Sequence, residues 1–184
     1  KERILKKKFV FTDEQKKAIY RGINERFSII DGPPGTGKST ITEAIIEWYN
    51  ILSKKKKNSN LNKISLQAPT GKAFKGLLEK CNNISEFSKN ISGTLHKVLL
   101  NIFNKIVRKY DEYQREDHNE EHKEETEVIE EPYVELIIID EASMIDIFMF
   151  KKILKWCDYF TCKLILCGDV DQLPPIGLRS EEHT

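Results

Sequence analysis

A run of small residues that ends in a lysine and a hydroxyl residue could bind the phosphates of a nucleotide. It reads Gly32-Pro33-Pro34-Gly35-Thr36-Gly37-Lys38-Ser39, and Thr40 follows it. Glycines let the backbone curl so that successive N–H groups point at phosphate oxygens. In such a loop the lysine, here Lys38, reaches the β- and γ-phosphates, and the hydroxyl group, here that of Ser39, binds Mg²⁺. The run therefore predicts a site for a nucleotide with Mg²⁺.

The residues on either side of this run support the same interpretation. A short apolar run that contains Phe27, Ile29 and Ile30 precedes it and predicts a strand. Apolar residues at helical spacing follow it and predict a helix over residues 40–52. A strand, a glycine-rich loop and a helix are the order that a phosphate-binding loop requires. The alternative, a turn rich in Gly and Pro that matches by chance, would not need this context.

Two adjacent acids could complete the chemistry of a phosphoryl-transfer site. Asp140 and Glu141 follow a nearly apolar run over residues 134–139, which is typical of a strand buried in a parallel sheet. Phosphoryl transfer needs a carboxylate near the metal and a second group that orients or deprotonates water. Asp140 could reach Mg²⁺ through water, and Glu141 could act on the attacking water. The alternative is an acidic helix N-terminus, which the helix dipole favours.

A third polar segment follows another predicted strand, over residues 163–167. It reads Leu-Cys-Gly-Asp-Val-Asp-Gln-Leu-Pro-Pro over residues 166–175. Gln172 in this segment could contact the γ-phosphate of a bound nucleotide. A turn followed by a proline-stiffened loop explains the same residues. The residue types alone favour neither interpretation.

Predicted strands and helices alternate along the chain. Besides the elements above, we expect a helix that starts near Thr12, a strand over residues 64–68, and helices over residues 71–78, 94–107 and 147–157. This alternation is typical of right-handed crossovers, and it predicts an α/β fold with a parallel sheet covered by helices on both faces. Ligands of such sheets bind at the carboxyl ends of the strands. The glycine-rich run and Asp140 both lie at such ends.

Composition narrows the class of protein. The 184 residues suit one domain (residues 1–184), and the formal net charge of +1 excludes neither nucleic acid nor acidic partners. The four cysteines have no metal-type or redox-type spacing, which favours buried thiols in a reducing compartment. The longest apolar run is too short to span a bilayer, and no signal peptide is visible. We therefore expect a cytoplasmic protein without membrane contact, with the nucleus not excluded.

The segment over residues 101–131 differs from the rest of the domain. Acidic side chains crowd residues 116–131, and apolar residues are almost missing from that stretch. This composition predicts a charged, flexible insertion within the domain. The chain also begins without Met, which indicates a piece of a longer protein.

Six blocks, taken in order, resemble superfamily one helicases, and specifically their RecD-like branch. They read Phe11-Thr12-Asp13-Glu14-Gln15, then residues 32–40, then Gln67-Ala68-Pro69-Thr70-Gly71-Lys72-Ala73, then Thr94-Leu95-His96, then Ile139-Asp140-Glu141-Ala142-Ser143-Met144, and Gly168-Asp169-Val170-Asp171-Gln172-Leu173-Pro174. The blocks are spread over nearly the whole range of residues 11–175. The resemblance implies the first RecA-like domain of a P-loop NTPase that binds ATP and Mg²⁺.

The resemblance also implies a role for individual residues. Gln15 would hydrogen-bond the adenine edge, and Gln172 would sense the γ-phosphate. A second set would line a track for single-stranded DNA, because small residues and exposed N–H groups at strand ends grip phosphates without reading bases. This set is Pro69, Thr70, Gly71, Lys72, Thr94 and His96. As alternatives, Lys72 would be an ordinary surface lysine and His96 a packed or solvent-facing histidine.

A protein of this kind would couple ATP hydrolysis to 5′→3′ movement along single-stranded DNA. It would need a second RecA-like domain with an arginine finger, which the 184 residues do not contain, and it could belong to a larger recombination or repair complex. We therefore expect the isolated domain to bind ATP and to hydrolyse it poorly, because such an arginine accelerates related NTPases by ~10³–10⁵. The acidic segment lacks the strand alternation of the duplex-splitting hairpin that the family often places there.

Two other classes of function remain open from the sequence. One is a nucleotide-switched protein-interaction module, with the acidic insertion as its docking surface. The other is a small-molecule kinase or a GTPase, since these proteins share the phosphate-binding loop. The Asp-Glu pair and the Gly-Asp-x-x-Gln segment favour an ATPase that activates water over a kinase, and no guanine-reading Asn-Lys-x-Asp occurs. Salt-dependent binding of single-stranded DNA would favour the helicase over the interaction module.

Overall fold

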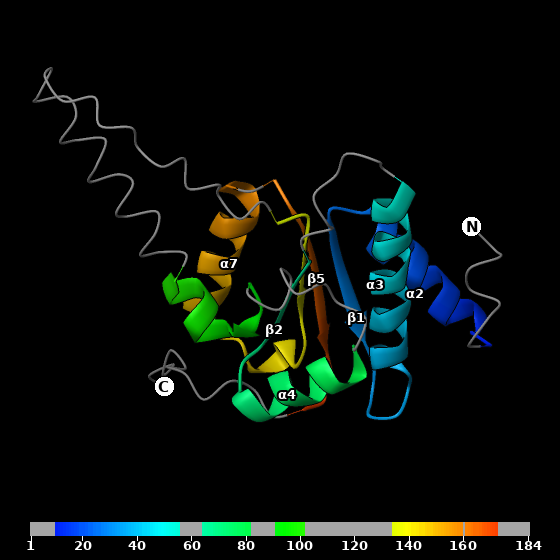
Figure 1. The fold of residues 1–184 in the computed structure, drawn as a ribbon. Helices are drawn as coiled ribbons and strands as arrows, with labels where there is room; N and C mark the ends of the chain where they lie inside the picture. The colour runs from blue at the N-terminus through cyan, green and yellow to red at the C-terminus, as the bar shows by residue number, and fades with distance from the viewer. Residues whose placement is uncertain (1–9, 56–63, 82–90, 102–133, 160, 173–184) are drawn as a thin grey trace, which may run out of the picture.

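Parallel strands form one sheet at the centre of the fold, which we describe from a computed structural model (Figure 1). The structure describes residues 10–55, 64–81, 91–101, 134–159 and 161–172. Within these residues the sheet has five strands in the order β1-β5-β4-β2-β3, and every neighbouring pair is parallel. The strands are β1 (Phe27–Asp31), β2 (Ile64–Ala68), β3 (Gly93–Thr94), β4 (Leu136–Ile139) and β5 (Lys163–Gly168).

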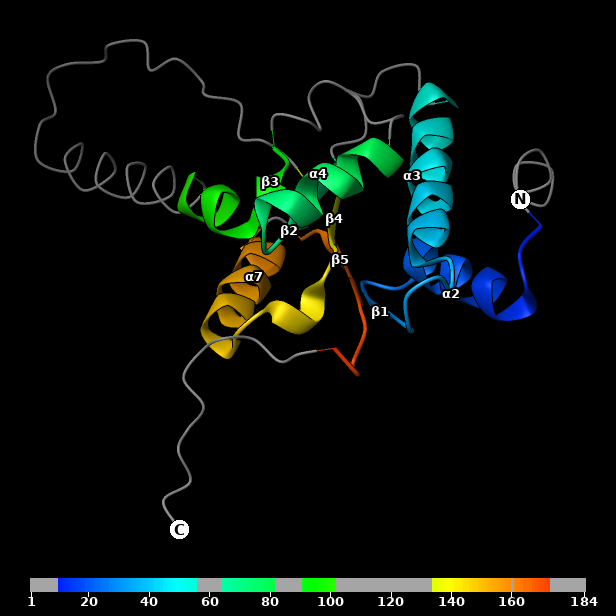
Figure 2. The same cartoon turned by 90° about the horizontal axis from the view of Figure 1, so that it is seen from below.

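Helices lie on both faces of this sheet (Figures 1 and 2). They are α2 (Asp13–Asn24), α3 (Lys38–Lys55), α4 (Gly71–Lys80) and α7 (Ile147–Tyr159), with a short 3₁₀ turn η1 (Ala142–Met144) and a further helical stretch over residues 95–101. None of the helices in the described part of the chain is both long and apolar enough to cross a membrane.

Two apolar clusters hold the layers together, one on each face of the sheet. Side chains of α2, α3 and α4 build the first cluster, and side chains of α7 and residues 95–101 build the second. Strand β4 contributes side chains to both clusters, because successive side chains of a strand point to opposite faces of the sheet. Leu136 and Ile138 belong to the first cluster, Ile137 and Ile139 to the second, and all four are completely buried.

The predicted α/β fold with a parallel sheet between helices is confirmed, with differences at the ends of elements. Strand β2 spans residues 64–68 as predicted. The helix predicted from Thr94 begins instead at residue 95, because the backbone of Thr94 pairs with Ala68 in the short strand β3, which the sequence did not indicate. The strand predicted over residues 134–139 begins at Leu136. Residues 102–131 of the predicted acidic insertion lie outside the described residues.

The helices leave part of β1 uncovered. This strand is at one edge of the sheet, and its side chains alternate between buried and exposed. Ser28 and Ile30 face the first cluster, whereas Phe27 and Ile29 remain 43% and 63% exposed. The apolar run before the glycine-rich loop is therefore a strand with one buried face.

The first cluster also contains three ionisable side chains, Tyr49, Cys81 and Cys167. Burial is the main reason why the pKa of each group rises to about 12, from an ordinary value of 10.0 for tyrosine and 9.0 for cysteine. All four cysteines of the chain are buried free thiols, as the sequence predicted. The two thiols of this cluster therefore stay protonated in the folded protein at pH values where an unfolded chain would ionise them.

We expect the free energy of unfolding to fall between about pH 9 and pH 12. The unfolded chain loses thiol protons as the pH passes 9, while the folded protein keeps them until its raised pKa, so ionisation stabilises the unfolded state. Urea unfolding at pH 8 and pH 11 tests this. Between these two pH values, the free energy of unfolding of the double variant Cys81→Ala/Cys167→Ala should fall by roughly 2–3 kcal/mol less for each thiol removed than that of the original protein. Equal losses for both proteins would contradict the assignment.

Candidate nucleotide-binding site

The register of the sheet brings the three polar segments to one edge. Asp31 is aligned with Gly168, and Ile139 is aligned with Leu166. The glycine-rich loop after β1, the acids after β4 and the turn after β5 therefore begin at nearly the same level. Because the strands are parallel, all three segments leave from the carboxyl edge, where ligands of such sheets bind.

The loop over residues 32–39 has the curled backbone that its glycines permit. Gly35 and Gly37 have φ values of 84° and 89°, in the left-handed region that side chains other than glycine rarely adopt. Thr36 closes the curl, because its hydroxyl donates to the carbonyl oxygen of Pro33 at 2.8 Å. The ammonium group of Lys38 donates to the carbonyl oxygens of Gly32 and Pro33. The loop thus holds the lysine head group against its own backbone.

Gln15 is fixed against this loop. Its side-chain oxygen accepts the backbone N–H of Thr12 at 3.1 Å, and the Thr12 hydroxyl accepts the N–H of Gln15 at 3.2 Å, which forms a capping box at the start of α2. The Nε2 atom of Gln15 donates to the carbonyl oxygen of Thr36 at 3.0 Å. This atom lies 2.7 Å from the point that a Cβ atom at Gly37 would occupy. A residue larger than glycine at position 37 would therefore push Gln15 away.

The loop that carries Lys38 and the acid Asp140 lie on either side of the end of β5, because β1 and β4 both pair with this strand in parallel register. The buried thiol of Cys167 belongs to β5, and the Thr42 hydroxyl of α3 is 3.5 Å from its sulfur. Burial raises the pKa of this thiol most strongly, the hydrogen bond with Thr42 lowers it, the carboxylate of Asp140 raises it and the ammonium of Lys38 lowers it. The influence of both charges on the thiol agrees with the strand register.

Glu141 has an unusual backbone conformation. It has φ 53° and ψ 41°, a left-handed conformation that is costly for a residue with a side chain. Its N–H donates to Oδ1 of Asp140 at 3.0 Å, and its carbonyl oxygen accepts the N–H of Met144 at 3.1 Å. The turn η1 packs on Gly168, where an added Cβ atom would lie 3.3 Å from the nitrogen of Ser143. The turn that follows the two acids thus packs closely on the end of β5.

Asp169 holds the turn that carries Gln172. Its side chain is 4% exposed. One carboxylate oxygen accepts the N–H of Asp171 at 3.1 Å, and the other accepts Nε2 of Gln172 at 3.3 Å. Asp31 at the end of β1 accepts the N–H of Val170 at 3.2 Å. Neither Asp31 nor Asp169 has a role predicted from the sequence, although the position of each at a strand end was a usable signal.

A contact that no motif indicated occurs at Ser39. The ammonium group of Lys80, the last residue of α4, donates to the Ser39 hydroxyl at 3.2 Å. The hydroxyl thus already contacts a cationic group. One carboxylate oxygen of Asp140 accepts the N–H of Glu141, which leaves the other oxygen for a metal ion.

Ser39 and Asp140 fit Mg²⁺, which takes hard oxygen ligands and is usually held by one or two protein groups plus phosphates and water. No group of three or more His, Cys, Asp or Glu side chains in the described residues could hold a metal. A metal at this edge would therefore depend on nucleotide phosphates for much of its coordination.

The six residues of the predicted DNA track lie at the same edge, toward its other end. Pro69 to Lys72 follow β2, and Thr70 caps α4 by accepting the N–H of Ala73 at 3.2 Å. Thr94 is aligned with Ala68, and His96 is exposed near the start of the helical stretch over residues 95–101. Strands β4 and β5 separate this group from the glycine-rich loop.

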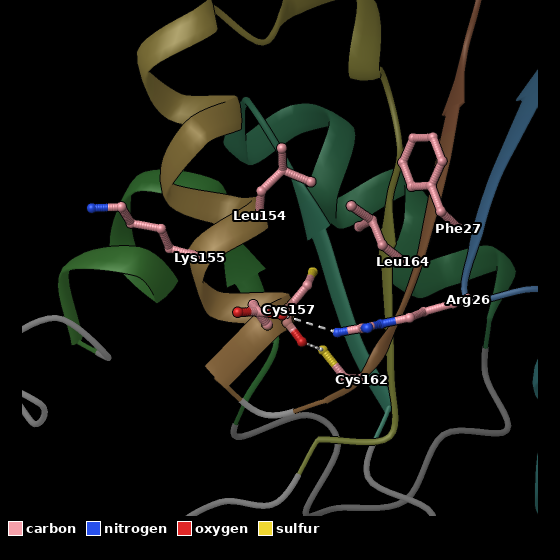
Figure 3. A pocket seen from close by; sticks show the side chains of 8 residues that line it. Arg26, Phe27, Leu154, Lys155, Cys157, Cys162 and Leu164 are labelled. Carbon is pink, nitrogen blue, oxygen red and sulfur yellow. Dashed lines mark hydrogen bonds and ion pairs between the residues drawn. The ribbon is translucent and has the colours of Figure 1, made fainter.

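A groove of about 480 Å³ lies at the opposite edge, where β1 and β5 begin and α7 ends (Figure 3). Its lining includes Phe27, Leu154, Cys157 and Cys162, with an ion pair of 3.2 Å between Arg26 and Asp158. None of the predicted site residues lines it. The groove is therefore separate from the candidate nucleotide site.

Comparisons with known proteins show the family to which the chain belongs. A family model described as AAA domain matches residues 15–178. The RecBCD enzyme subunit RecD of Buchnera aphidicola subsp. Schizaphis graminum is 34% identical over 179 residues, which cover 91% of this chain and 26% of that protein. The ATP-dependent RecD2 DNA helicase of Deinococcus radiodurans is 28% identical over 165 residues, which cover 90% of this chain and 18% of that protein.

The fold also occurs in a solved helicase structure. The crystal structure of the Pif1 helicase from Candida albicans has a TM-score of 0.54 and 21% sequence identity, and the match covers 92% of this chain and 34% of that one. The chain thus spans about a quarter or less of the two RecD-type proteins. On the match to the family model and the similarity to these relatives, the chain belongs to the AAA domain family and is a distant homologue of the RecD helicase proteins.

Proposed function

We propose that the chain is the first motor domain of a longer RecD-like helicase, which couples ATP hydrolysis to 5′→3′ movement on single-stranded DNA. The observation that carries this proposal is the register of the sheet, which puts the loop with Lys38, the acid Asp140 and the turn with Gln172 at one carboxyl edge. The homologues support the class of protein, because one is named an ATP-dependent DNA helicase and another a subunit of the RecBCD enzyme. A larger complex for recombination or repair is part of the proposal.

The nucleotide would lie on the glycine-rich loop. The N–H groups of residues 32–40 and the ammonium of Lys38 would hold its phosphates. Ser39 and Asp140 would hold Mg²⁺, which neutralises the charge that develops on the phosphate oxygens. Glu141 would accept a proton from the attacking water, and Gln172 would contact the γ-phosphate. Gln15 would bind the adenine edge, for which its amide group must exchange the contact with Thr36.

Single-stranded DNA would cross the ends of β2 and β3. Exposed backbone after β2, the Lys72 ammonium and the side chains of Thr94 and His96 would contact its phosphates and sugars. Movement would require a second RecA-like domain that supplies an arginine finger and closes on the nucleotide. The 184 residues alone would then bind ATP with Mg²⁺ and hydrolyse it slowly.

Lys38→Ala should weaken nucleotide binding at least about tenfold, because the phosphates lose a charge-assisted hydrogen bond. Titration of the protein into a fluorescent ATP analogue with Mg²⁺ measures the affinity. Lys152→Ala, which removes an exposed lysine of α7, serves as the control and should bind normally. Unchanged affinity of Lys38→Ala would refute the assignment of the loop.

Glu141→Gln, made in the full-length protein, should lower kcat for ATP by about 10²–10⁴, because a glutamine cannot accept the proton of the attacking water. ATP affinity should change less than about twofold, since the substitution keeps the shape of the side chain. DNA-stimulated ATPase assays and nucleotide titrations give the two numbers. The control is Glu47→Gln on the exposed face of α3. A kcat equal to that of the original protein would remove Glu141 as the base.

Lys72→Ala should weaken binding of single-stranded DNA and reduce the slope of log K against log salt by about one, because one phosphate contact is lost. Lys72 is the better residue to change than Thr70, because the Thr70 hydroxyl also caps α4. Fluorescence anisotropy at several salt concentrations measures both effects, and Lys75→Ala on the same helix is the control. DNA binding that is absent or independent of salt in the original protein would favour the nucleotide-switched interaction module instead.

A further inference from the structure

Helix α4 lies between two parts of the carboxyl edge, the proposed DNA track and the phosphate-binding loop. It runs from the end of β2 toward the start of α3 (Figures 1 and 2). Thr70, Gly71 and Lys72 of the proposed DNA track are at its start, and Lys80 is its last residue. Ten residues of α-helix span about 15 Å. One short helix therefore reaches from the DNA track to the phosphate-binding loop.

The last turn of α4 is held in place by burial. Leu77 and Cys81 are 2% and 1% exposed and belong to the first apolar cluster, and the N–H of Cys81 donates to the carbonyl oxygen of Leu77 at 3.0 Å. Lys80 lies between these two anchors but is itself exposed. Its backbone position is thus fixed, while its side chain is free to change conformation.

The Lys80 ammonium reaches the start of α3. It donates to the Ser39 hydroxyl at 3.2 Å. Burial raises the pKa of the neighbouring Cys81 thiol most strongly, the carboxylates of Glu43 and Asp140 raise it further, and Lys80 lowers it. The hydrogen bond of Lys80 thus brings a positive charge to the oxygen that the proposed function gives to Mg²⁺.

We propose that Lys80 is a positioning residue that competes with Mg²⁺ for the Ser39 hydroxyl and so links nucleotide binding to the position of α4. The proposal rests on the proposed function of the loop. A hydroxyl oxygen that binds Mg²⁺ at 2.0–2.1 Å cannot keep an ammonium group at hydrogen-bond distance, because the two cations repel each other across a few ångströms. Lys80 must therefore leave Ser39 when the metal binds.

The link to DNA follows from the same contact. The bond from Lys80 to Ser39 ties the end of α4 to the start of α3 only while Mg²⁺ is not on Ser39. A contact that exists in one state and not in the other is what coupling between two sites requires. Binding of ATP with Mg²⁺ would remove this contact between α4 and α3, while Leu77 and Cys81 keep the last turn packed on the core. The two states would then differ in how firmly α4 is held, and so in how its start presents Thr70 to Lys72.

Lys80→Met tests the competition, because methionine keeps most of the length of the side chain without its charge. A fluorescent ATP analogue is held at fixed concentration, and MgCl₂ is titrated until binding is half-maximal. The variant should need about two- to five-fold less Mg²⁺ than the original protein, the range expected when one exposed charged contact no longer has to be broken. Lys80→Arg, which keeps a cation, should restore the original requirement, and Lys75→Met should leave it unchanged.

Three results would overturn the proposal. An unchanged Mg²⁺ requirement in Lys80→Met would show that Lys80 does not compete with the metal. Weaker binding of the analogue to Lys80→Met both in EDTA and in Mg²⁺ would show that Lys80 contacts the phosphates directly. If the original protein does not bind the analogue at all, the proposed function fails together with the role of Lys80. Normal binding with an unchanged Mg²⁺ requirement would contradict the role of Lys80 alone.

A second measurement tests the link to DNA in the full-length protein. The affinity for single-stranded DNA is measured with and without a non-hydrolysable ATP analogue and Mg²⁺. The ratio of the two affinities gives the coupling between the nucleotide site and the DNA track. The ratio should lie closer to one in Lys80→Met than in the original protein, whereas Lys75→Met should retain the original ratio. An identical ratio in the original protein and in Lys80→Met would refute the link through α4.

Discussion

The parallel pairing of β5 with β1 on one side and β4 on the other is the constraint on which the rest of the structure depends. It aligns the end of β1 with Gly168 and places Asp140 one residue beyond the pair of Ile139 and Leu166. Three loops from distant parts of the chain then start at one level. Without this register, a glycine-rich loop, a pair of acids and a polar turn would be three separate surface features.

Small residues allow these loops to approach each other closely. Gly168 leaves room for η1, and Gly37 leaves room for the Gln15 amide. The left-handed backbone of Glu141 has a cost that the surrounding contacts must offset, among them the bond from its own N–H to Asp140. Strained residues of this kind persist where the structure around them fixes the conformation, and they gather at functional sites. The geometry of this edge is thus built by packing as much as by polar contacts.

Helix α4 adds a connection along the same edge. Its start is capped by Thr70, its last turn is anchored by Leu77 and Cys81, and Lys80 contacts Ser39. Under the proposed function, α4 has one end at the DNA track and the other at the phosphate-binding loop, which is the arrangement that coupling between these two sites would need. Lys80 itself is exposed, so its charge remains in contact with solvent while its ammonium group reaches Ser39.

The sequence by itself determined the local elements and the chemistry of the main groups. Runs such as residues 64–68 and 134–139 are apolar enough to indicate buried strands. The residue types of the glycine-rich loop are by themselves enough to predict that it binds phosphate groups. The alternation of strands and helices was sufficient for the α/β class, because short-range patterns fix which segments become strands or helices.

Only the tertiary structure decided which of these groups meet. The strand order, the two-residue strand β3 and the contact of Lys80 with Ser39 join residues far apart in the chain, and such pairings depend on the packing of the whole core. Lys80 has no signal in the sequence, because a lysine at the end of a helix is ordinary until the partner of its side chain is known. Patterns along the chain indicate where an element begins and ends and which of its faces is buried. Which distant residues come into contact is decided only when the helices pack on both faces of the sheet.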